Sequence, residues 1–98
     1  SAHDWPALGL AISGVPSGSR LSDLRIVLSA AVDRPILLER VADILQGAEI
    51  TDALLREAGQ AAVESVELAS DSQGTAEYKQ QILRIYLARV TKTILSAE

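Results

Sequence analysis

His3 is the single histidine of the chain, and Asp4 follows it directly. Imidazole and carboxylate groups are the usual acids and bases of catalysis, and both also bind metal ions. A hydrolytic triad places its histidine between a nucleophile and an orienting acid, and a zinc site needs at least three protein ligands. Two adjacent residues near one end of the chain supply neither set. We therefore expect no catalytic residue and no metal-binding residue.

Two other patterns have a superficial likeness to reactive sites. Glu57, Glu64 and Glu67 fall within one predicted helix, and paired carboxylates act as acid and base when their environments separate their pKa values. The surrounding residues do not predict burial, so we interpret the three as a solvated helix face. The segment 14–19 (GVPSGS) has two glycines but lacks the Lys-Ser/Thr ending of a phosphate-binding loop. Because it joins two predicted strands, we expect a hairpin loop.

Aromatic and charged groups give two further candidates. Tyr78 and Tyr86 are eight residues apart, with Ile82 and Ile85 between them, which predicts an apolar seam of a helix against the sheet. A contact with a partner or a cofactor is the alternative for this seam.

Eight charged residues alternate in sign in the first half of the chain. We interpret them as a solvated surface, with an inter-subunit patch as the alternative. They are Arg20, Asp23, Arg25, Asp33, Arg34, Glu39, Arg40 and Asp43.

The elements that must position these groups begin with two strands. Residues 7–13 and 21–32 alternate between apolar and other side chains, with Leu24, Ile26 and Leu28 on one face of the second stretch. The short loop between the two stretches predicts an antiparallel hairpin. Because two strands alone are marginally stable, we expect either a third strand from upstream or helices that cover the pair.

Three helices follow the predicted hairpin. Asp33 and Pro35 predict the start of a first helix that ends before Gly47, since proline suits a first helical turn and glycine the residue after the last. Thr51 and Thr75 predict the N-caps of helices that run to about residues 66 and 95. The fold class is therefore α+β: a small antiparallel sheet of two to three strands, followed by three helices packed on it and on each other.

Size and composition limit the classes of function. The 98 residues suffice for a single domain over 1–98, and the net charge of −4 without a basic stripe argues against nucleic acid as a partner. No apolar run reaches the ~18 residues that a membrane span needs. Because the chain has no cysteine, it cannot ligate an iron–sulfur cluster with its own thiolates. It begins almost inside the first predicted strand, so we expect a fragment of a longer protein.

Four short stretches, in their order and spacing, resemble one known domain: 23–28 (DLRIVL), 34–36 (RPI), 42–47 (ADILQG) and 74–79 (GTAEYK). It is the C-terminal domain of the flavoprotein subunit of carbon monoxide dehydrogenase, xanthine dehydrogenase and related molybdenum hydroxylases. The resemblance covers nearly the whole chain and includes the opening residues 3–6 (HDWP). It departs from the family at Lys79, where arginine is usual, at Asp43, where glutamate is usual, and at 29–31, where a glycine pair is common.

The resemblance implies a cofactor and partners for the parent subunit, in the cytoplasm. The subunit would bind FAD mainly through earlier domains that this chain lacks, and no cofactor would bind this chain tightly. Its partners would be those FAD-binding domains, a molybdenum-cofactor subunit and a subunit with 2Fe–2S clusters, which pass electrons to the flavin. In relatives the segment around His3 and Asp4 enters from the flavin side, so these two are the candidate cofactor-binding residues.

Two other hypotheses remain open at this point. An independent small α+β module that binds a ligand or a protein, with no redox role, predicts a pocket between the sheet and the helices. A stand-alone enzyme would depend on His3. Under the resemblance, the parent subunit is part of an oxidoreductase and the isolated domain is not catalytic.

Overall fold

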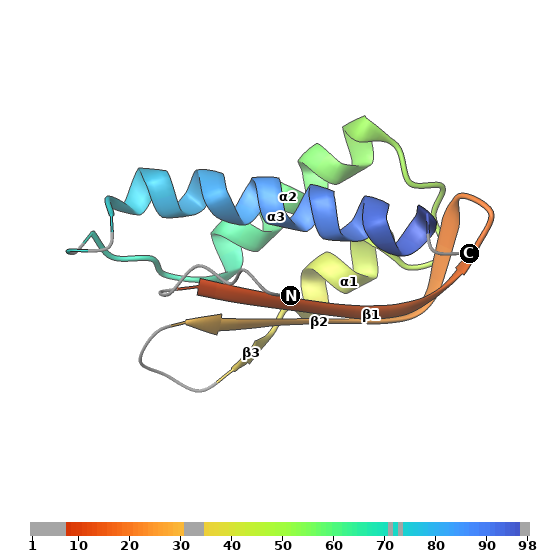
Figure 1. Ribbon diagram of the computed structural model, residues 1–98, viewed down its shortest axis with the longest axis horizontal. Coiled ribbons are helices and arrows are strands. Elements are labelled where there is room, and N and C mark those ends of the chain that lie inside the picture. The colour runs from red at the N-terminus through yellow and green to blue at the C-terminus, as the bar shows by residue number, and fades with distance from the viewer. Residues whose placement is uncertain (1–7, 31–34, 71, 73, 97–98) are drawn as a thin grey trace.

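The chain forms a three-stranded antiparallel sheet with three helices packed on one of its faces (Figure 1). The computed structural model describes residues 8–30, 35–70, 72 and 74–96. The strands are β1 (Leu8–Ser17), β2 (Arg20–Ala30) and β3 (Ile36–Leu37), in this order across the sheet. The helices are α1 (Glu39–Leu45), α2 (Asp52–Ser65) and α3 (Ala76–Ser96). The predicted α+β class is confirmed.

β1 and β2 form the predicted hairpin, with their apolar residues in register. Ile12 lies opposite Ile26, and both face the helices. The turn consists of Gly18 and Ser19 alone, and the φ of 62° at Gly18 is a conformation that glycine adopts at little cost. The longer loop predicted for 14–19 is therefore wrong, because strand pairing continues as far as Ser17 opposite Arg20.

A β-bulge interrupts the hairpin in the middle of the segment that composition had marked as a loop. Gly14 of β1 faces two residues of β2, Asp23 and Leu24, and Asp23 takes up the extra length with a φ of 52°. A Cβ atom on Gly14 would lie 3.0 Å from a methyl carbon of Leu24. Bulges increase the local twist of a hairpin. Beyond this one, the tip curves toward the helices (Figure 1).

β3 replaces what the sequence predicted as the first turn of a helix. Leu37 pairs with Val27 of β2, and the N–H of Leu38 donates to the carbonyl of Ile26 at 2.8 Å. The first helix therefore begins at Glu39 and not at Pro35. Its predicted cap, Asp33, lies outside the described residues. A strand of two residues has no period that the sequence alone could reveal.

The connection between α1 and α2 holds the tip of the hairpin. The N–H of Gly47 donates to the carbonyl of Leu21 at 2.8 Å, and the N–H of Ile50 donates to that of Ser19 at 2.9 Å. Gly47 ends the helix as predicted, with a φ of 72°, and its own carbonyl accepts from the guanidinium of Arg20 at 2.7 Å. These bonds close the end of the sheet that lies farthest from β3.

The two longer helices begin at the predicted threonines. The hydroxyl of Thr51 accepts from the N–H of Leu54 at 3.1 Å, and that of Thr75 accepts from the N–H of Tyr78 at 3.0 Å. Each bond satisfies an N–H group that has no partner within the helix. The N-cap predictions for α2 and α3 are confirmed.

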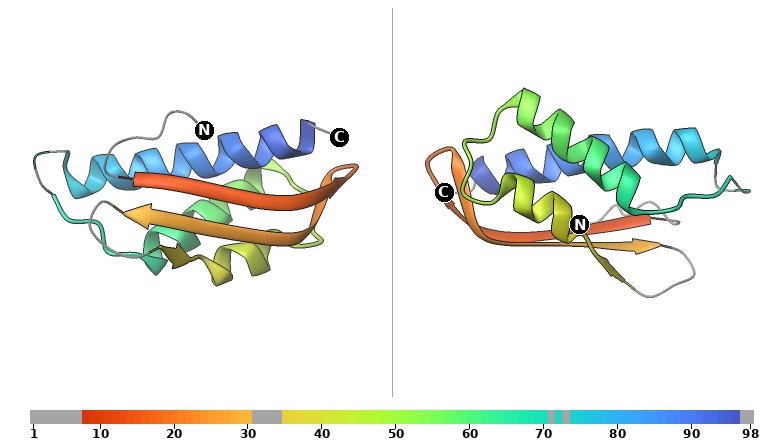
Figure 2. Two further views of the ribbon diagram at one scale, coloured as in Figure 1. Left: turned by 60° about the horizontal axis from the view of Figure 1, so that its bottom comes forward. Right: turned by 180° about the vertical axis from the view of Figure 1, so that it is seen from behind.

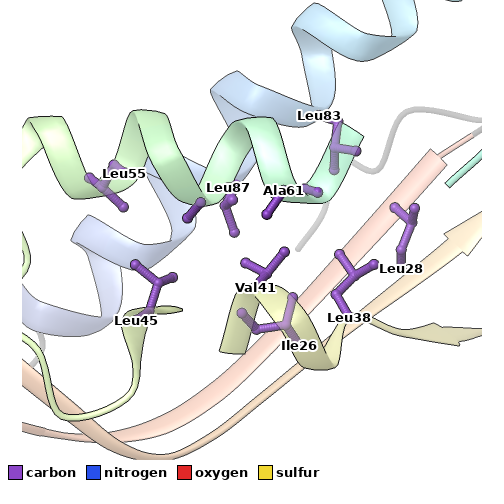
Figure 3. Close-up of a cluster of buried hydrophobic side chains, with 11 residues drawn as sticks. Ile26, Leu28, Leu38, Val41, Leu45, Leu55, Ala61, Leu83 and Leu87 are labelled. Atoms are coloured by element: carbon purple, nitrogen blue, oxygen red, sulfur yellow. The ribbon is translucent and has the colours of Figure 1, made fainter. Parts of the chain in front are cut away.

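The core between the sheet and the helices consists of aliphatic side chains (Figure 3). Ile26 and Leu28 come from the sheet, Val41 and Leu45 from α1, and a run of leucines and alanines from α2 and α3. The small side chains of α2 allow close packing of the helices, which suits a chain without phenylalanine or methionine. The remaining members of the buried cluster are Leu38, Leu55, Ala58, Ala61, Ala62, Leu83 and Leu87.

Candidate interaction surface

All three helices lie on one face of the sheet, and no described element covers the other (Figure 2, left). We call this other side the open face. Side chains alternate along a strand, so the neighbours of the buried Ile26 and Leu28 point away from the helices. The residues of the open face are Gly9, Ala11 and Ser13 of β1, Arg25, Val27 and Ser29 of β2, and Leu37 of β3.

The residues named for the open face include few charged and few large side chains. Ala11, Val27 and Leu37 lie in one register row across the three strands, and Leu37 is 40% exposed. An antiparallel sheet with one solvated face normally carries polar side chains there. Here the outward positions are held mainly by small or aliphatic residues, with Arg25 as the one charged group among those named above. Such a surface is typical of a face that packs against another protein layer.

A hollow of about 450 Å³ opens at the edge of the sheet, where β3 ends and α1 begins. Four charged residues line it: Asp23 and Arg25 of β2, and Glu39 and Asp43 of α1. None of the four forms an ion pair or a side-chain hydrogen bond within the described part of the chain. Half of the mixed charged cluster identified in the sequence therefore gathers at this hollow, next to the open face.

The other members of that cluster do different things. Arg20 holds the α1–α2 connection through Gly47, which is a structural role. Arg40 forms an ion pair of 2.8 Å with Glu64, which joins α1 to α2 at the surface. Asp33 and Arg34 lie outside the described residues. Arg20 is nevertheless exposed, as are the other five members that the structure describes, so the interpretation as a solvated surface holds for these six.

The carboxylates of α2 form the predicted solvated face. Glu57 and Glu64 of α2 are exposed, and Glu67, which was predicted in the same helix, is exposed in the connection after α2 ends at Ser65. Hydrogen bonds from Gln60, which has the larger effect, and from Arg40 lower the pKa of Glu64 below its ordinary value of 4.5. A carboxylate with a lowered pKa stays ionised near neutral pH, which is unsuited to a general acid.

The two tyrosines of α3 do not form the predicted seam against the sheet. Tyr78 is 51% exposed and Ile85 is 39% exposed, whereas Ile82 and Tyr86 are half-buried. The face of α3 that enters the core instead carries Lys79, Leu83, Leu87 and Thr91. Lys79 is buried because its ammonium group donates to the carbonyl of Ala69 at 2.7 Å, in the α2–α3 connection. The apolar pattern of α3 predicted the wrong face, because the face that enters the core begins with a lysine, a residue that is normally exposed.

The candidate cofactor contacts His3 and Asp4 lie outside the described residues. Within the described ranges there is no group of three or more side chains that would hold a metal ion. No helix there has the length and apolar content needed to cross a membrane. The described glycines form no phosphate cradle, since Gly18 occupies a hairpin turn and Gly47 a helix end.

Comparisons with known proteins give a consistent assignment. The family model of the CO dehydrogenase flavoprotein C-terminal domain matches residues 1–94. The nicotine 6-hydroxylase medium subunit of Paenarthrobacter nicotinovorans is 28% identical over 86 residues, which are 88% of this chain and 30% of that protein.

Solved structures agree with the sequence comparisons. Carbon monoxide dehydrogenase from Hydrogenophaga pseudoflava matches with a TM-score of 0.73 and 28% identity, over 84% of this chain and 29% of that one. Quinoline 2-oxidoreductase from Pseudomonas putida 86 matches with a TM-score of 0.78 and 25% identity, over 92% of this chain and 32% of that one. The chain thus spans about three tenths of the length of these relatives.

Proposed function

The chain belongs to the family of CO dehydrogenase flavoprotein C-terminal domains, and from this membership we propose that it is an accessory domain of a molybdenum hydroxylase. In this proposal residues 1–98 form one domain of a longer FAD-binding subunit. That subunit belongs to a cytoplasmic oxidoreductase of the carbon monoxide dehydrogenase and xanthine dehydrogenase type. The observation that carries the proposal is the family match over 1–94, which includes all three strands, α1 and α2, and all but the last two residues of α3.

The domain acts by packing, through its open face, against the FAD-binding domains of its own subunit. Three features support this role. The open face has one charged residue, Arg25, among the seven named for it, and no described element covers it. It adjoins the hollow whose charged groups have no partners within the described chain. Relatives have about 70% of their length outside the matched region, which is ample chain to cover such a face.

FAD itself binds mainly outside this domain. The hollows described in the chain have volumes of about 280 and 450 Å³, within or below the range of sites for drug-sized ligands, and FAD is larger than such ligands. The described residues also offer no glycine-rich loop at a helix start for a diphosphate. The domain therefore supports electron transfer from 2Fe–2S clusters to flavin by keeping the FAD-binding domains in place, and companion subunits carry those clusters and the molybdenum cofactor.

His3 and Asp4 are the proposed point of closest approach to the flavin. A histidine and a carboxylate near an isoalloxazine ring change its reduction potential through their charges. Their contribution is electrostatic, because neither completes a catalytic set. His3→Ala in the full-length subunit should shift the flavin reduction potential and leave the amount of bound flavin unchanged. An unchanged potential would remove His3 from the proposal.

The test of the main proposal uses the full-length parent. The complete open reading frame is expressed, and its visible spectrum is recorded after purification and again after incubation with FAD. We expect a flavin absorption band at one flavin per chain. A folded parent that stays colourless after incubation with FAD would overturn the assignment and favour an independent binding module.

A further inference from the structure

A groove between α2 and α3 is lined by three cationic side chains, although the chain as a whole is acidic. It has a volume of about 280 Å³ and is lined by Asp52, Leu55, Arg56 and Gly59 of α2 and by Arg84, Ala88 and Lys92 of α3. Three cationic side chains and one carboxylate give the groove a net charge of +2. The whole chain carries −4, so the groove is opposite in sign to the rest of the molecule. We call this feature the cationic groove.

The three cations differ in how far they are already engaged. Lys92 pairs with Asp52 at 3.1 Å, and both side chains remain largely exposed. Arg84 donates to the side-chain carbonyl of Gln60 at 2.6 Å, which leaves its other N–H groups available. Arg56 forms no hydrogen bond and no ion pair within the described residues. At least two guanidinium groups therefore face the groove with donors to offer.

Small and aliphatic residues form the floor between these charges. Gly59 has no side chain, and a Cβ atom placed there would lie 3.4 Å from the aliphatic stem of Arg84. Ala88 and the largely buried Leu55 complete an apolar surface below the cations. A binding partner can thus lay methylene groups on the floor while its charged ends reach the rim. Arginine beside apolar contact area is a common composition at the energetic centres of protein interfaces.

The spacing of the cations favours a segment of chain over a single small ion. Arg84 and Lys92 are two turns apart on α3, a distance of about 12 Å along the helix axis at about 1.5 Å per residue. The oxygens of one phosphate group cannot reach both ends of that distance. Carboxylates two turns apart on a helix, or about four residues apart in an extended segment at about 3.3 Å per residue, have a matching separation.

We propose that the cationic groove is a docking site for an acidic segment of a partner protein, with carboxylates that pair with Arg56, Arg84 and Lys92. The proposal does not depend on flavin, because the groove lies between the helices and not on the open face. It rests on charge complementarity and on the apolar floor beneath the charges. When the partner binds, Lys92 leaves Asp52 and pairs with a carboxylate of the partner. A segment with several carboxylates therefore competes best with Asp52 for Lys92.

The test uses the 98-residue chain with a blocked oligoglutamate peptide as the probe. Amide chemical shifts are followed by two-dimensional NMR at low ionic strength, where exposed charges interact over longer distances. We expect shifts concentrated in residues 52–59 and 84–92, and weaker binding as salt is added. The chain as a whole is negative and so repels an acidic peptide. Binding that is confined to the groove therefore cannot come from the net charge of the chain.

Variants separate the groove from other positive charges. Arg56→Gln should weaken binding about tenfold, which corresponds to about 1.4 kcal/mol, and it breaks no contact in the described structure. Arg89→Gln, on α3 but outside the groove, makes the same chemical change at an exposed arginine and should bind as the unmodified chain does.

Three results would overturn the proposal. The first is the absence of localised shifts, and the second is an equal loss of binding in Arg89→Gln. The third is binding of inorganic phosphate at the groove as tight as that of the peptide, since this would indicate an ion site. The spectra of the variants also report whether each remains folded, so a loss of binding through unfolding is recognised.

Discussion

The two faces of the sheet are built from the same strands, yet they differ in almost every property. Ile26 and Leu28 of β2 are fully buried under the helices, whereas Arg25 and Ser29 on the same strand are exposed. The buried face carries large branched side chains, and the open face carries glycine, alanine and serine beside a few aliphatic groups. The first composition stabilises the domain by itself. The second suits a surface that is completed by another layer of protein.

A matched pair of leucine substitutions would break or support this comparison most strongly. Leu28→Ala removes a fully buried side chain and should lower the free energy of unfolding by about 2–5 kcal/mol. Leu37→Ala makes the same chemical change on the open face, where the side chain is 40% exposed, and should cost about 1 kcal/mol or less. Urea unfolding of the 98-residue chain measures both. Equal losses would mean that the open face is part of the core.

The buried side of the fold also contains an unsatisfied polar group, which a substitution can remove. Thr91 is fully buried, and its hydroxyl has no hydrogen-bond partner among the described residues. Thr91→Val replaces the hydroxyl with a methyl group of similar size and should raise the free energy of unfolding by about 1 kcal/mol. Thr93→Val is the control, because that hydroxyl is exposed and already donates to the carbonyl of Arg89 at 2.9 Å. A destabilised Thr91→Val chain would mean that the hydroxyl has a partner after all.

A substitution on the outer surface of the helices should change the free energy of unfolding least, and only at acidic pH. Because the pKa of Glu64 is lowered in the folded chain by Gln60 and Arg40, its ionised form favours folding. That contribution is fully present above the ordinary value of 4.5 and is lost as the pH falls through the lower, folded value. Glu64→Gln should therefore flatten the acid side of the stability profile slightly. Thermal unfolding between neutral and acidic pH measures this, and an unchanged profile would show that the pairing is negligible.

Local patterns predicted the parts of the fold that depend on neighbouring residues. Alternation placed Ile26 and Leu28 on the buried face because strand geometry alone dictates it. Thr51 and Thr75 were identified as caps from residue type and position, and this succeeded because a capping hydroxyl bonds to an N–H only three residues ahead. β3 was missed because its two residues pair only through contacts with β2, which lies earlier in the chain.

The interaction surfaces were harder to predict, because they join residues distant in sequence. The bulge at Gly14 resembles a turn in composition, and only pairing with Asp23 and Leu24 reveals it. The cationic groove brings α2 and α3 together, and neither helix shows an unusual charge pattern alone. The hollow at the edge of β2 was partly foreseen as a mixed charged cluster, since its residues are close in the chain.

The most direct test of the central claim compares the open face in the isolated chain and in the full-length parent. The chain has no cysteine, so Ala11→Cys introduces one thiol on the open face, and Glu57→Cys introduces one on the exposed surface of α2. The extent of iodoacetamide labelling of each site is read by mass spectrometry of the corresponding peptide. The account predicts that both thiols react in the isolated chain, and that only Ala11→Cys is protected in the parent. Equal labelling of Ala11→Cys in the two contexts would contradict the claim that the rest of the subunit packs on the open face.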